Sequence, residues 1–478
     1  MKRKALLSAL LAAAMVMGTL SGCGNTGGSE SSGQQSSTPE SKEESTEQSS
    51  EDESSSEAAD ESSEPSESGS EAAWQSLLEI ETLEDPNVTL DHYWDPEGRD
   101  FFEMAAIKRY EEKYGEGTVT VNVIGWNGGI EALQNELAAN DVSDLIFTEG
   151  NACFPSYATK NYFQPITEYI QKDLGSDFMD DASMSNFKYC DEYYVFTNAA
   201  ATRPYLLAYY TPLFKDNALE TPGELYAKGE WTWDKFLEYC DMLTVDNDGD
   251  GKIDQWGLGP RYKWQNFAYA AGIIGIEEVG NGVLQSNWED ENMLKYFEFI
   301  TKLETIQARA KDEEGNVYND GWLGTGAMYI EAINQEQLAN RDEDGNILGN
   351  NEDTSFVPLP TMDGSMASTP VWDKGYAIPE GAGNPLGGAV LAAMILDEYA
   401  KGLKAEQEQY MTADELKLYY ECMAKTIPQR KNDDLYEGVT MSYGEEEAKA
   451  GTPAATIIDT YKDVVKNEVQ AYNDKLGQ

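Results

Sequence analysis

The segment from Asp246 to Asp254 carries the strongest chemical motif of the chain. Carboxylates occupy alternate positions, a glycine (Gly251) stands at the sharp turn, and the pattern is the acidic half of an EF-hand loop. The last position of such a loop is Gly257 in place of a bidentate glutamate, so another carboxylate or water must complete the coordination. We expect a structural Ca²⁺ ion here, the alternative being a polar turn that binds nothing. The expected ligands are the side chains of Asp246, Asp248, Asp250 and Asp254 and the backbone carbonyl of Lys252.

Other residue types that support metal or nucleophilic chemistry are few and dispersed. His92 is the single histidine, which excludes zinc sites built from two or three histidines. Cys153, Cys190, Cys240 and Cys422 lie far apart, with no metal-like spacing. Export would permit disulfides, but their connectivity cannot be derived from sequence, and buried or free thiols are an equal alternative. No nucleophile elbow or histidine-based triad is present.

Alternating strands and helices position the first part of the chain. We expect strands over 88–94, 119–124 and 144–147 and helices over 101–114 and 130–140. Short links between them predict a parallel sheet covered by helices. Ligands bind such sheets beyond the carboxyl ends of the strands, which here are Trp94, Gly125 with Trp126, and residues 148–151.

A second unit begins after about residue 202. We expect helices over 233–243, 266–275, 292–308 and 385–398 and strands over 354–359 and 375–379. Late strands after a helical block indicate that the chain returns to its first lobe. The fold class predicted is therefore α/β, with two hinged lobes that each hold a central sheet flanked by helices, and with a cleft between them.

Composition narrows the classes of ligand. The chain of 478 residues has 34 Lys and Arg against 87 Asp and Glu, a formal net charge of -53. A polyphosphate would be repelled, so nucleic acid is excluded as a partner. An anionic ligand is less expected for the same reason, although a local basic pocket could override the mean. Aromatic residues make up 11% of the chain, and this supports a folded body.

The first residues have the features of an export signal. Lys2 to Lys4 are basic, an apolar run follows to Met17, and Leu20 to Cys23 resembles a bacterial lipobox. We expect a signal peptide over 1–22 and a lipid on Cys23, the alternative being an ordinary signal peptide. The segment up to residue 84 is rich in Ser and Glu and is expected to be a disordered acidic tether, or alternatively a charged signalling tail. The membrane contact expected is the lipid anchor alone, on the extracellular face.

Six strings together resemble the carbohydrate-type extracellular solute-binding proteins of ABC importers, similar to maltose-binding protein. They lie at 144–151, 157–170, 203–219, 231–236 (WTWDKF), 324–329 and 356–379. The resemblance covers roughly residues 85–470, and the string at 324–329 resembles a helix start of the family. It implies a two-lobed periplasmic-binding-protein type II fold, an importer as partner and a monomer. Members often carry the acidic loop without its terminal glutamate, which supports calcium.

The resemblance also implies a division into lobes and a ligand. Lobe 1 is expected to comprise residues 85–202 with about 325–385, and lobe 2 residues 203–324 with about 386–478. Aromatic rings stack on the apolar faces of sugars while polar side chains take the hydroxyls. The ligand-binding candidates are Trp94, Trp126, Glu149, Asn151, Tyr205, Trp264, Trp322 and Trp372.

For each candidate tryptophan the alternative is core packing, and we place Trp231 and Trp233 in the core. Arg203 could hold a ligand carboxylate or pair with the acidic surface, and we expect the pair. The function predicted is capture of a sugar or oligosaccharide between the lobes and its delivery to an importer, with no chemistry on the ligand. The alternatives are a carbohydrate-active enzyme with a carboxylate pair, a polyamine-binding protein and a surface scaffold.

Overall fold

The computed structural model describes residues 75–96, 101–125, 129–170, 182–259, 263–309, 326–333, 339–341, 347–350 and 352–476. The predicted signal peptide, the lipobox cysteine Cys23 and most of the predicted tether lie outside these residues. Trp126 and Trp322 lie outside them as well.

The first sheet has four strands in the order β15-β3-β1-β2. Strands β1 (Val88–His92), β2 (Val119–Val123) and β3 (Leu145–Glu149) are parallel, and β15 (Lys374–Ala377) is antiparallel to β3. All five residues of β3 are buried, as expected for a strand covered on both faces. The predicted βαβαβ arrangement is confirmed.

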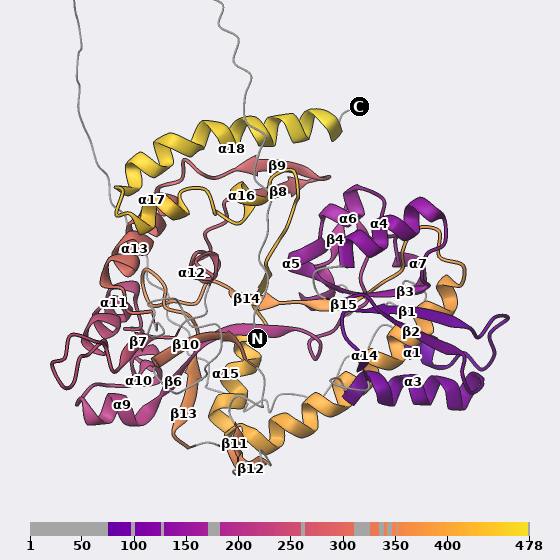
Figure 1. Cartoon of the computed structure of the whole chain (residues 1–478), viewed down its shortest axis with the longest axis horizontal. Helices are drawn as coiled ribbons and strands as arrows, with labels where there is room; N and C mark the ends of the chain where they lie inside the picture. Colours follow the sequence, from indigo (N-terminus) through magenta and orange to yellow (C-terminus); the bar gives the residue numbers. More distant parts are fainter. Residues whose placement is uncertain are drawn as a thin grey trace, which may run out of the picture. The chain divides into compact units, whose positions relative to one another are not determined.

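Helices α3 (Phe101–Tyr114) and α14 (Pro385–Tyr410) cover one face of this sheet and lie side by side (Figure 1). Their contact is close at Gly402, where a Cβ atom would come within 1.8 Å of the Phe102 ring. The core beneath them combines β3, β15 and the buried residues 389–396 of α14. Helix α4 (Gly129–Ala139) contributes Leu133 to a smaller core that also contains Ile146 and Ala377 of the sheet.

The second sheet has six strands, with the path β16-β14-β6-β10-β7 and β13 also paired with β6. Its long strand β6 (Arg203–Tyr210) is antiparallel to β10 (Gly326–Ala332), β13 (Thr354–Val357) and β14 (Thr369–Trp372). The parallel pairs join β10 to β7 (Trp256–Leu258) and β14 to β16 (Thr426–Pro428).

The core of the second sheet is rich in aromatic residues from α11 (Trp233–Met242), α12 (Gln265–Ala270) and α13 (Glu291–Ile306). Trp231 and Trp233 are 1% and 6% exposed, which confirms their predicted place in the core. The Trp231 indole donates to the carbonyl of Pro358 at 3.1 Å, and the Thr232 hydroxyl caps α11 by accepting from the Lys235 amide.

Shorter elements and three hairpins complete the described chain. The helices are α1 (Gln75–Leu78), α5 (Gly150–Cys153), α6 (Ser156–Thr159), α7 (Thr167–Ile170), α8 (Ala182–Ser185), α9 (Thr211–Asp216), α10 (Pro222–Ala227), α15 (Ala413–Met423), α16 (Tyr436–Val439), α17 (Glu445–Lys449) and α18 (Ala454–Leu476). The hairpins pair β4 (Lys188–Tyr189) with β5 (Glu192–Tyr193), β8 (Ile276–Gly280) with β9 (Val283–Ser286), and β11 (Ala339–Arg341) with β12 (Ile347–Asn350).

Two segments belong to a different sheet from the one that the predicted lobe division gives them. Strands β10 and β13 pair with β6 in the second sheet, whereas the first part of α14 packs on the first sheet. The helix start expected at 324–329 is also wrong, because β10 begins there. A short apolar run buried on both faces has no period that separates strand from helix.

The chain passes from the second sheet to the first through one residue. Strand β14 ends at Trp372, Asp373 follows, and β15 begins at Lys374. An earlier passage lies beside it, because Phe196 bridges Tyr376 of β15 and Arg203 pairs with Trp372. The mixed α/β class with helix-flanked sheets is thus as predicted. Among the described helices, none combines the length and apolar character needed to cross a bilayer.

Candidate functional site

Five side chains gather where the chain passes between the sheets, and we call them the crossover cluster: Arg203, Tyr205, Trp372, Lys374 and Glu149. The pairing explains the grouping, since Trp372 lies opposite Arg203 and Lys374 opposite Glu149. Paired residues of neighbouring strands, and residues two apart on one strand, project from the same face. The cluster therefore draws on three separate segments of sequence.

Glu149 ends β3 and is 7% exposed. The Trp372 side chain hydrogen-bonds to its carboxylate, while its Oε1 atom has no hydrogen-bond partner. Burial raises the pKa of Glu149 to about 7, although the Trp372 hydrogen bond and the charges of Lys263 and Lys374 pull it down. Near neutral pH this group is thus poised between acceptor and donor, and it has bonding capacity left for a ligand.

Cations surround the Trp372 ring. The Arg203 guanidinium lies 5.4 Å from the ring centre and the Lys374 ammonium 5.8 Å from it. Lys374 is 3% exposed and donates to the Tyr399 hydroxyl at 2.9 Å. Among the residues that the structure describes, no acid forms an ion pair with Arg203, so its expected pairing with the acidic surface stays a prediction.

Trp94 lies near the cluster on the far side of Phe147, and Tyr205 is one of its members. The rings of Trp94 and Phe147 lie 5.0 Å apart, and the Lys374 ammonium lies 5.9 Å from Phe147. Burial raises the pKa of the Tyr205 hydroxyl, and the nearby charges of Glu331 and Glu149 add to this effect. The structure therefore brings together Trp94, Glu149, Tyr205 and Trp372, four of the eight predicted ligand-binding residues.

Trp264 is placed elsewhere among the predicted residues. It is 6% exposed in the core of the second sheet, and its indole donates to Glu304 Oε1 at 2.9 Å. The backbone of Asn151 lies in α5, but its side chain is outside the description, as are Trp126 and Trp322. The site residue that sequence reasoning missed is Lys374, whose signal was a lysine between two strand-like runs.

His92 has a structural role at the end of β1. Its Nδ1 atom lies 2.9 Å from the carbonyl oxygen of Trp94, and its Nε2 atom lies 2.9 Å from Glu103 Oε1. Tyr376 also donates to that Glu103 oxygen. These bonds are buried and internal, and they fix the backbone that carries Trp94.

A second charged group lies on the other face of the crossing strand. Asp373 is fully buried, and neither carboxylate oxygen has a hydrogen-bond partner. Burial raises the pKa of Asp373 to about 7, while the charge of Arg430 opposes the rise. A Cβ atom on Gly150 would come within 2.4 Å of this carboxylate, and the Gly150 amide donates to the Asp373 carbonyl at 2.9 Å. Arg430 donates to the carbonyl of Asn186.

A cavity of about 230 Å³ adjoins Arg430. Its wall combines Pro155, from the segment after β3, with Tyr269 and Asn432 from the second sheet's core and its connections. The same two segments are joined by the ion pair between Lys160 and Asp433 at 2.6 Å. This side of the crossing therefore has a cavity between the two segments, and an ion pair within the chain joins the segments beside it.

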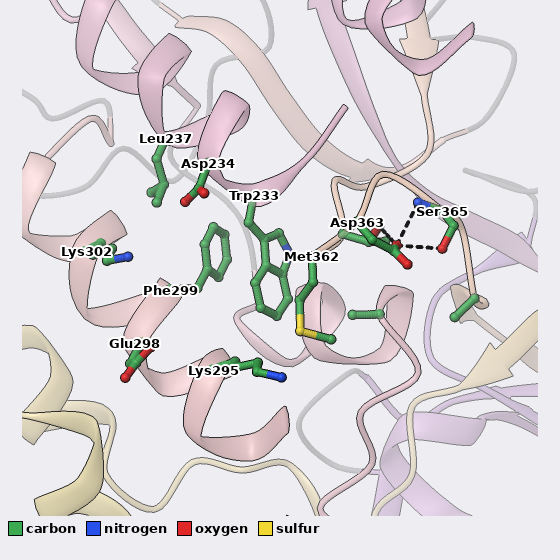
Figure 2. A pocket seen from close by; sticks show the side chains of 13 residues that line it. Trp233, Asp234, Leu237, Lys295, Glu298, Phe299, Lys302, Met362, Asp363 and Ser365 are labelled. Carbon is green, nitrogen blue, oxygen red and sulfur yellow. Dashed lines mark hydrogen bonds between the residues drawn. The ribbon is translucent and has the colours of Figure 1, made fainter. Parts of the chain in front are cut away.

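A larger hollow of about 570 Å³ has a lining that comes wholly from α11, α13 and neighbouring loops (Figure 2). Trp233 stacks on Phe299 at its edge, with ring centres 4.5 Å apart and planes 14° apart. The Asp363 carboxylate accepts from the amide and hydroxyl of Ser365 (Figure 2). Because none of the described lining residues belongs to the first sheet, this hollow has no described second wall, and the crossover cluster is the better candidate site.

The acidic loop folds around its own backbone. Asp246 accepts from the amides of Gly249 at 2.7 Å and Gly251 at 2.8 Å, which lowers its pKa. Asp254 accepts from the Asn247 amide at 2.7 Å. One carboxylate oxygen each of Asp246, Asp248 and Asp254 lie within 4.8 Å of one another. Three of the four predicted carboxylates thus converge, and Asp250 instead accepts from the Lys252 amide.

The four described cysteines are free thiols. Cys153, Cys240 and Cys422 are buried, and Cys190 is exposed. Burial raises the pKa of each of the three buried thiols. The question left open by the sequence therefore resolves to unpaired cysteines in this structure.

Comparison with known proteins identifies the family of this chain. The family model of bacterial extracellular solute-binding proteins matches residues 95–401. The chain belongs to that family. A comparison with curated protein sequences found no match. As a bacterial extracellular solute-binding protein it joins a class of binding proteins, as the resemblance implied.

Solved structures of solute-binding proteins show the same fold. One is an ABC substrate-binding protein from Listeria monocytogenes in complex with cycloalternan, 15% identical, with a TM-score of 0.57, covering 82% of this chain and 99% of that one. Another is the maltose/maltodextrin-binding domain from Bdellovibrio bacteriovorus bound to maltotriose, 18% identical, with a TM-score of 0.54 and coverage of 81% and 99%. A third, from Mycobacterium tuberculosis, is in complex with glycerophosphocholine, 14% identical, with a TM-score of 0.57 and coverage of 82% and 99%. The two-lobed type II periplasmic-binding-protein fold is therefore confirmed.

Proposed function

We propose that this solute-binding protein is anchored by a lipid on Cys23, captures a saccharide at the crossover cluster and delivers it to an ABC importer. The observation that carries the proposal is the position of the cluster at the passage between two sheets. Residues from both sheets face one another there, so a solute touching them contacts both lobes at once. Similar structures that hold cycloalternan and maltotriose support a saccharide.

The cluster offers the groups that a saccharide requires. Trp94 and Tyr205 offer ring surface, Glu149 Oε1 has no hydrogen-bond partner, and the Arg203 guanidinium lies beside them over the Trp372 ring. A ligand that satisfies groups on both lobes binds the closed arrangement better than the open one, and so shifts the population toward closure. The importer would then recognise the closed form.

Binding is tested by intrinsic tryptophan fluorescence and calorimetry with a panel of mono- and oligosaccharides. We expect saturable binding without release of reducing sugar, and about 10- to 100-fold weaker binding in Glu149→Gln, because a buried donor of the ligand loses a charged acceptor. The matched control is the exposed residue Lys302, changed to Ala. Turnover of an oligosaccharide would support the enzyme alternative, binding of spermidine alone a polyamine carrier, and no binding at all a scaffold.

The enzyme alternative gains no support from the paired carboxylates of this region. Glycosidases place two carboxyl groups on either side of the bond they cleave. Glu149 and Asp373 both have raised pKa values, but Asp373 is fully buried against Gly150 on the other face of the strand. A substrate at Glu149 therefore has no access to it.

We further propose that the acidic loop binds Ca²⁺ through Asp246, Asp248 and Asp254, with Asp250 and the Lys252 carbonyl as further ligands. Oxygen ligands in this number and spacing suit Ca²⁺. An ion present at 100 times its Kd would stabilise the folded state by about 2.7 kcal/mol. We expect EDTA to lower the melting temperature of wild type but not of Asp248→Asn, with Asp241→Asn, an exposed acid outside the loop, behaving as wild type. Equal melting temperatures of wild type in Ca²⁺ and in EDTA would contradict the proposed calcium site.

The lipid anchor is tested by changing Cys23 to Ser in a bacterial host. We expect the wild-type protein in the membrane fraction and the variant in the soluble extracytoplasmic fraction, because one thioether-linked lipid is the sole predicted attachment. Equal fractionation of both would contradict the anchor and leave the binding function untouched.

A further inference from the structure

Arg203 is a charged group of the crossover cluster whose guanidinium has no ion pair among the described residues. Its guanidinium lies over the Trp372 ring, 5.4 Å from the ring centre, and it is half-buried. No ion pair joins it to any described residue, although the chain has 87 acidic residues. A guanidinium is matched in geometry to carboxylates and phosphates, which it binds through two parallel hydrogen bonds.

The neighbourhood of Arg203 is richer in basic residues than the protein as a whole. The Lys374 ammonium lies near the same ring. The charges of Lys374 and Lys263 both lower the pKa of Glu149. The Lys263 ammonium also donates to Gln429 Oε1 at 3.2 Å. Glu149 is the acid on which Lys263 and Lys374 act, and Glu331 and Asp373 also act on groups of the cluster. Three described cations therefore lie among three described acids, whereas the whole chain has 34 basic against 87 acidic side chains.

Trp372 holds this arrangement together. Its side chain hydrogen-bonds to Glu149, and both cations approach its ring. A ring engaged in this way positions Arg203 and is not a free stacking platform for a sugar. Stacking is left to the neighbouring rings of Trp94 and Tyr205.

From these contacts we propose that the solute carries an acidic group, a carboxylate or a phosphate on a saccharide, and that Arg203 binds this group. The inference rests on the proposed function and specifies its solute class. Arg203 supplies the paired N–H donors, Trp372 orients them, and Lys263 and Lys374 attract the anion. The same charges disfavour a polyamine, which would have to approach three cations.

The experiment compares matched probes on the purified protein by calorimetry at low and high salt. The probes are trigalacturonate, the neutral trisaccharide maltotriose, and glucose 6-phosphate. We expect wild type to bind one acidic probe at least about tenfold more tightly than the neutral probe, and 0.5 M salt to weaken that binding. Preference for trigalacturonate identifies a carboxylate, and preference for glucose 6-phosphate identifies a phosphate.

Variants assign the effect to Arg203. Arg203→Ala is expected to weaken binding of the acidic probe about 10- to 100-fold and to change maltotriose binding little. Arg203→Lys is expected to have an intermediate affinity for the acidic probe, because lysine keeps the charge but lacks the paired N–H donors. Lys302→Ala, at an exposed residue outside the cluster, is the control. Melting curves of the variants check that each is folded.

The outcomes separate the two proposals. Tight binding of maltotriose that Arg203→Ala leaves unchanged, with no preference for an acidic probe, overturns the acidic solute and preserves saccharide capture. Acidic binding unaffected by Arg203→Ala overturns the role of Arg203. Failure of wild type to bind all three probes and the neutral panel overturns both.

Discussion

Charged side chains on the two faces of the segment from β14 to β15 have different surroundings. On one face Arg203 and Glu149 lie beside half-buried rings, and Glu149 Oε1 has no hydrogen-bond partner. On the other, Arg430 donates to the carbonyl of Asn186, and Asp373 is shut under Gly150. Neighbouring residues of this segment, such as Asp373 and Lys374, therefore lie in different surroundings. Unpartnered carboxylate oxygens occur on both faces, but Asp373 is fully buried, whereas Glu149 lies beside half-buried rings. The face of Glu149 is therefore the one suited to a ligand.

This difference also shows why raised pKa values alone do not locate the site. Burial raises the pKa of both Glu149 and Asp373 to about 7. Only Glu149 has polar and aromatic neighbours from both sheets that a solute could contact. Geometry therefore decides the function, and the pKa values describe how each acid responds to pH.

The largest expected effect is the pH dependence of stability. Asp373 has a folded pKa of about 7 against 3.8 in its ordinary state, and Glu149 about 7 against 4.5. At these two acids the folded state binds protons more tightly than the unfolded one, so their contribution to stability is greatest at low pH and is lost as pH rises through about 7. Between pH 5.5 and 8 each acid contributes about 2 kcal/mol to this fall.

The measurement is thermal and denaturant unfolding of the ligand-free protein at pH 5.5 and 8. Asp373→Asn should remove most of the pH dependence that Asp373 contributes to the free energy of unfolding, and the variant should be more stable than wild type at pH 8. Glu149→Gln should likewise remove the part that Glu149 contributes. A wild type whose stability rises between these pH values would show that neither acid is buried as described.

A smaller loss is expected for Arg430→Met, which removes the half-buried cation that acts on Asp373. The Asn186 carbonyl loses its donor, and Asp373 loses the charge that opposes its raised pKa. We expect a destabilisation of about 2–3 kcal/mol at pH 8, reduced at pH 5.5 where Asp373 is protonated. Unfolding of the double variant with Asp373→Asn tests the link, since the cost should shrink when the acid is gone. An equal cost at both pH values would contradict it.

Gly150→Ala should destabilise by about 1–3 kcal/mol through overpacking. The added methyl group would lie 2.4 Å from a carboxylate oxygen of Asp373, which has no room to withdraw because it is fully buried. Gly117→Ala is a poor control because its backbone has a φ of 74°. Gly383→Ala is the better one, with 3.8 Å to its nearest atom. Equal melting of Gly150→Ala and wild type would mean that Asp373 moves freely.

The smallest effect on stability is expected for Arg203→Met. It breaks no hydrogen bond or ion pair to a described residue and costs a cation–π contact worth about 0.5–1 kcal/mol. Its contrast with Arg430→Met, measured side by side by unfolding, is the direct test of the difference between the two faces. If the Arg203 variant were the less stable of the two, this assignment of the two faces would be wrong.

Local patterns in the sequence were enough to predict most of the elements of the first sheet and the class of the fold. Periodicity located β1, α3, β2, α4 and β3 to within a few residues, because strands and amphipathic helices have different spacings of apolar residues. The sequence also located the acidic loop, because its carboxylates are close together along the chain. Those predictions depend on local order alone.

Tertiary structure decided everything that joins distant segments. Arg203, Glu149 and Trp372 meet only because β14 runs into β15 between two sheets, and strand pairing between residues far apart leaves no local signal. The sheet to which β10 and α14 belong was misassigned for the same reason. Tryptophans were judged by their flanking residues, yet Trp264 is enclosed in a core and Trp94 lies near the cluster, because burial depends on neighbours that only the folded chain supplies.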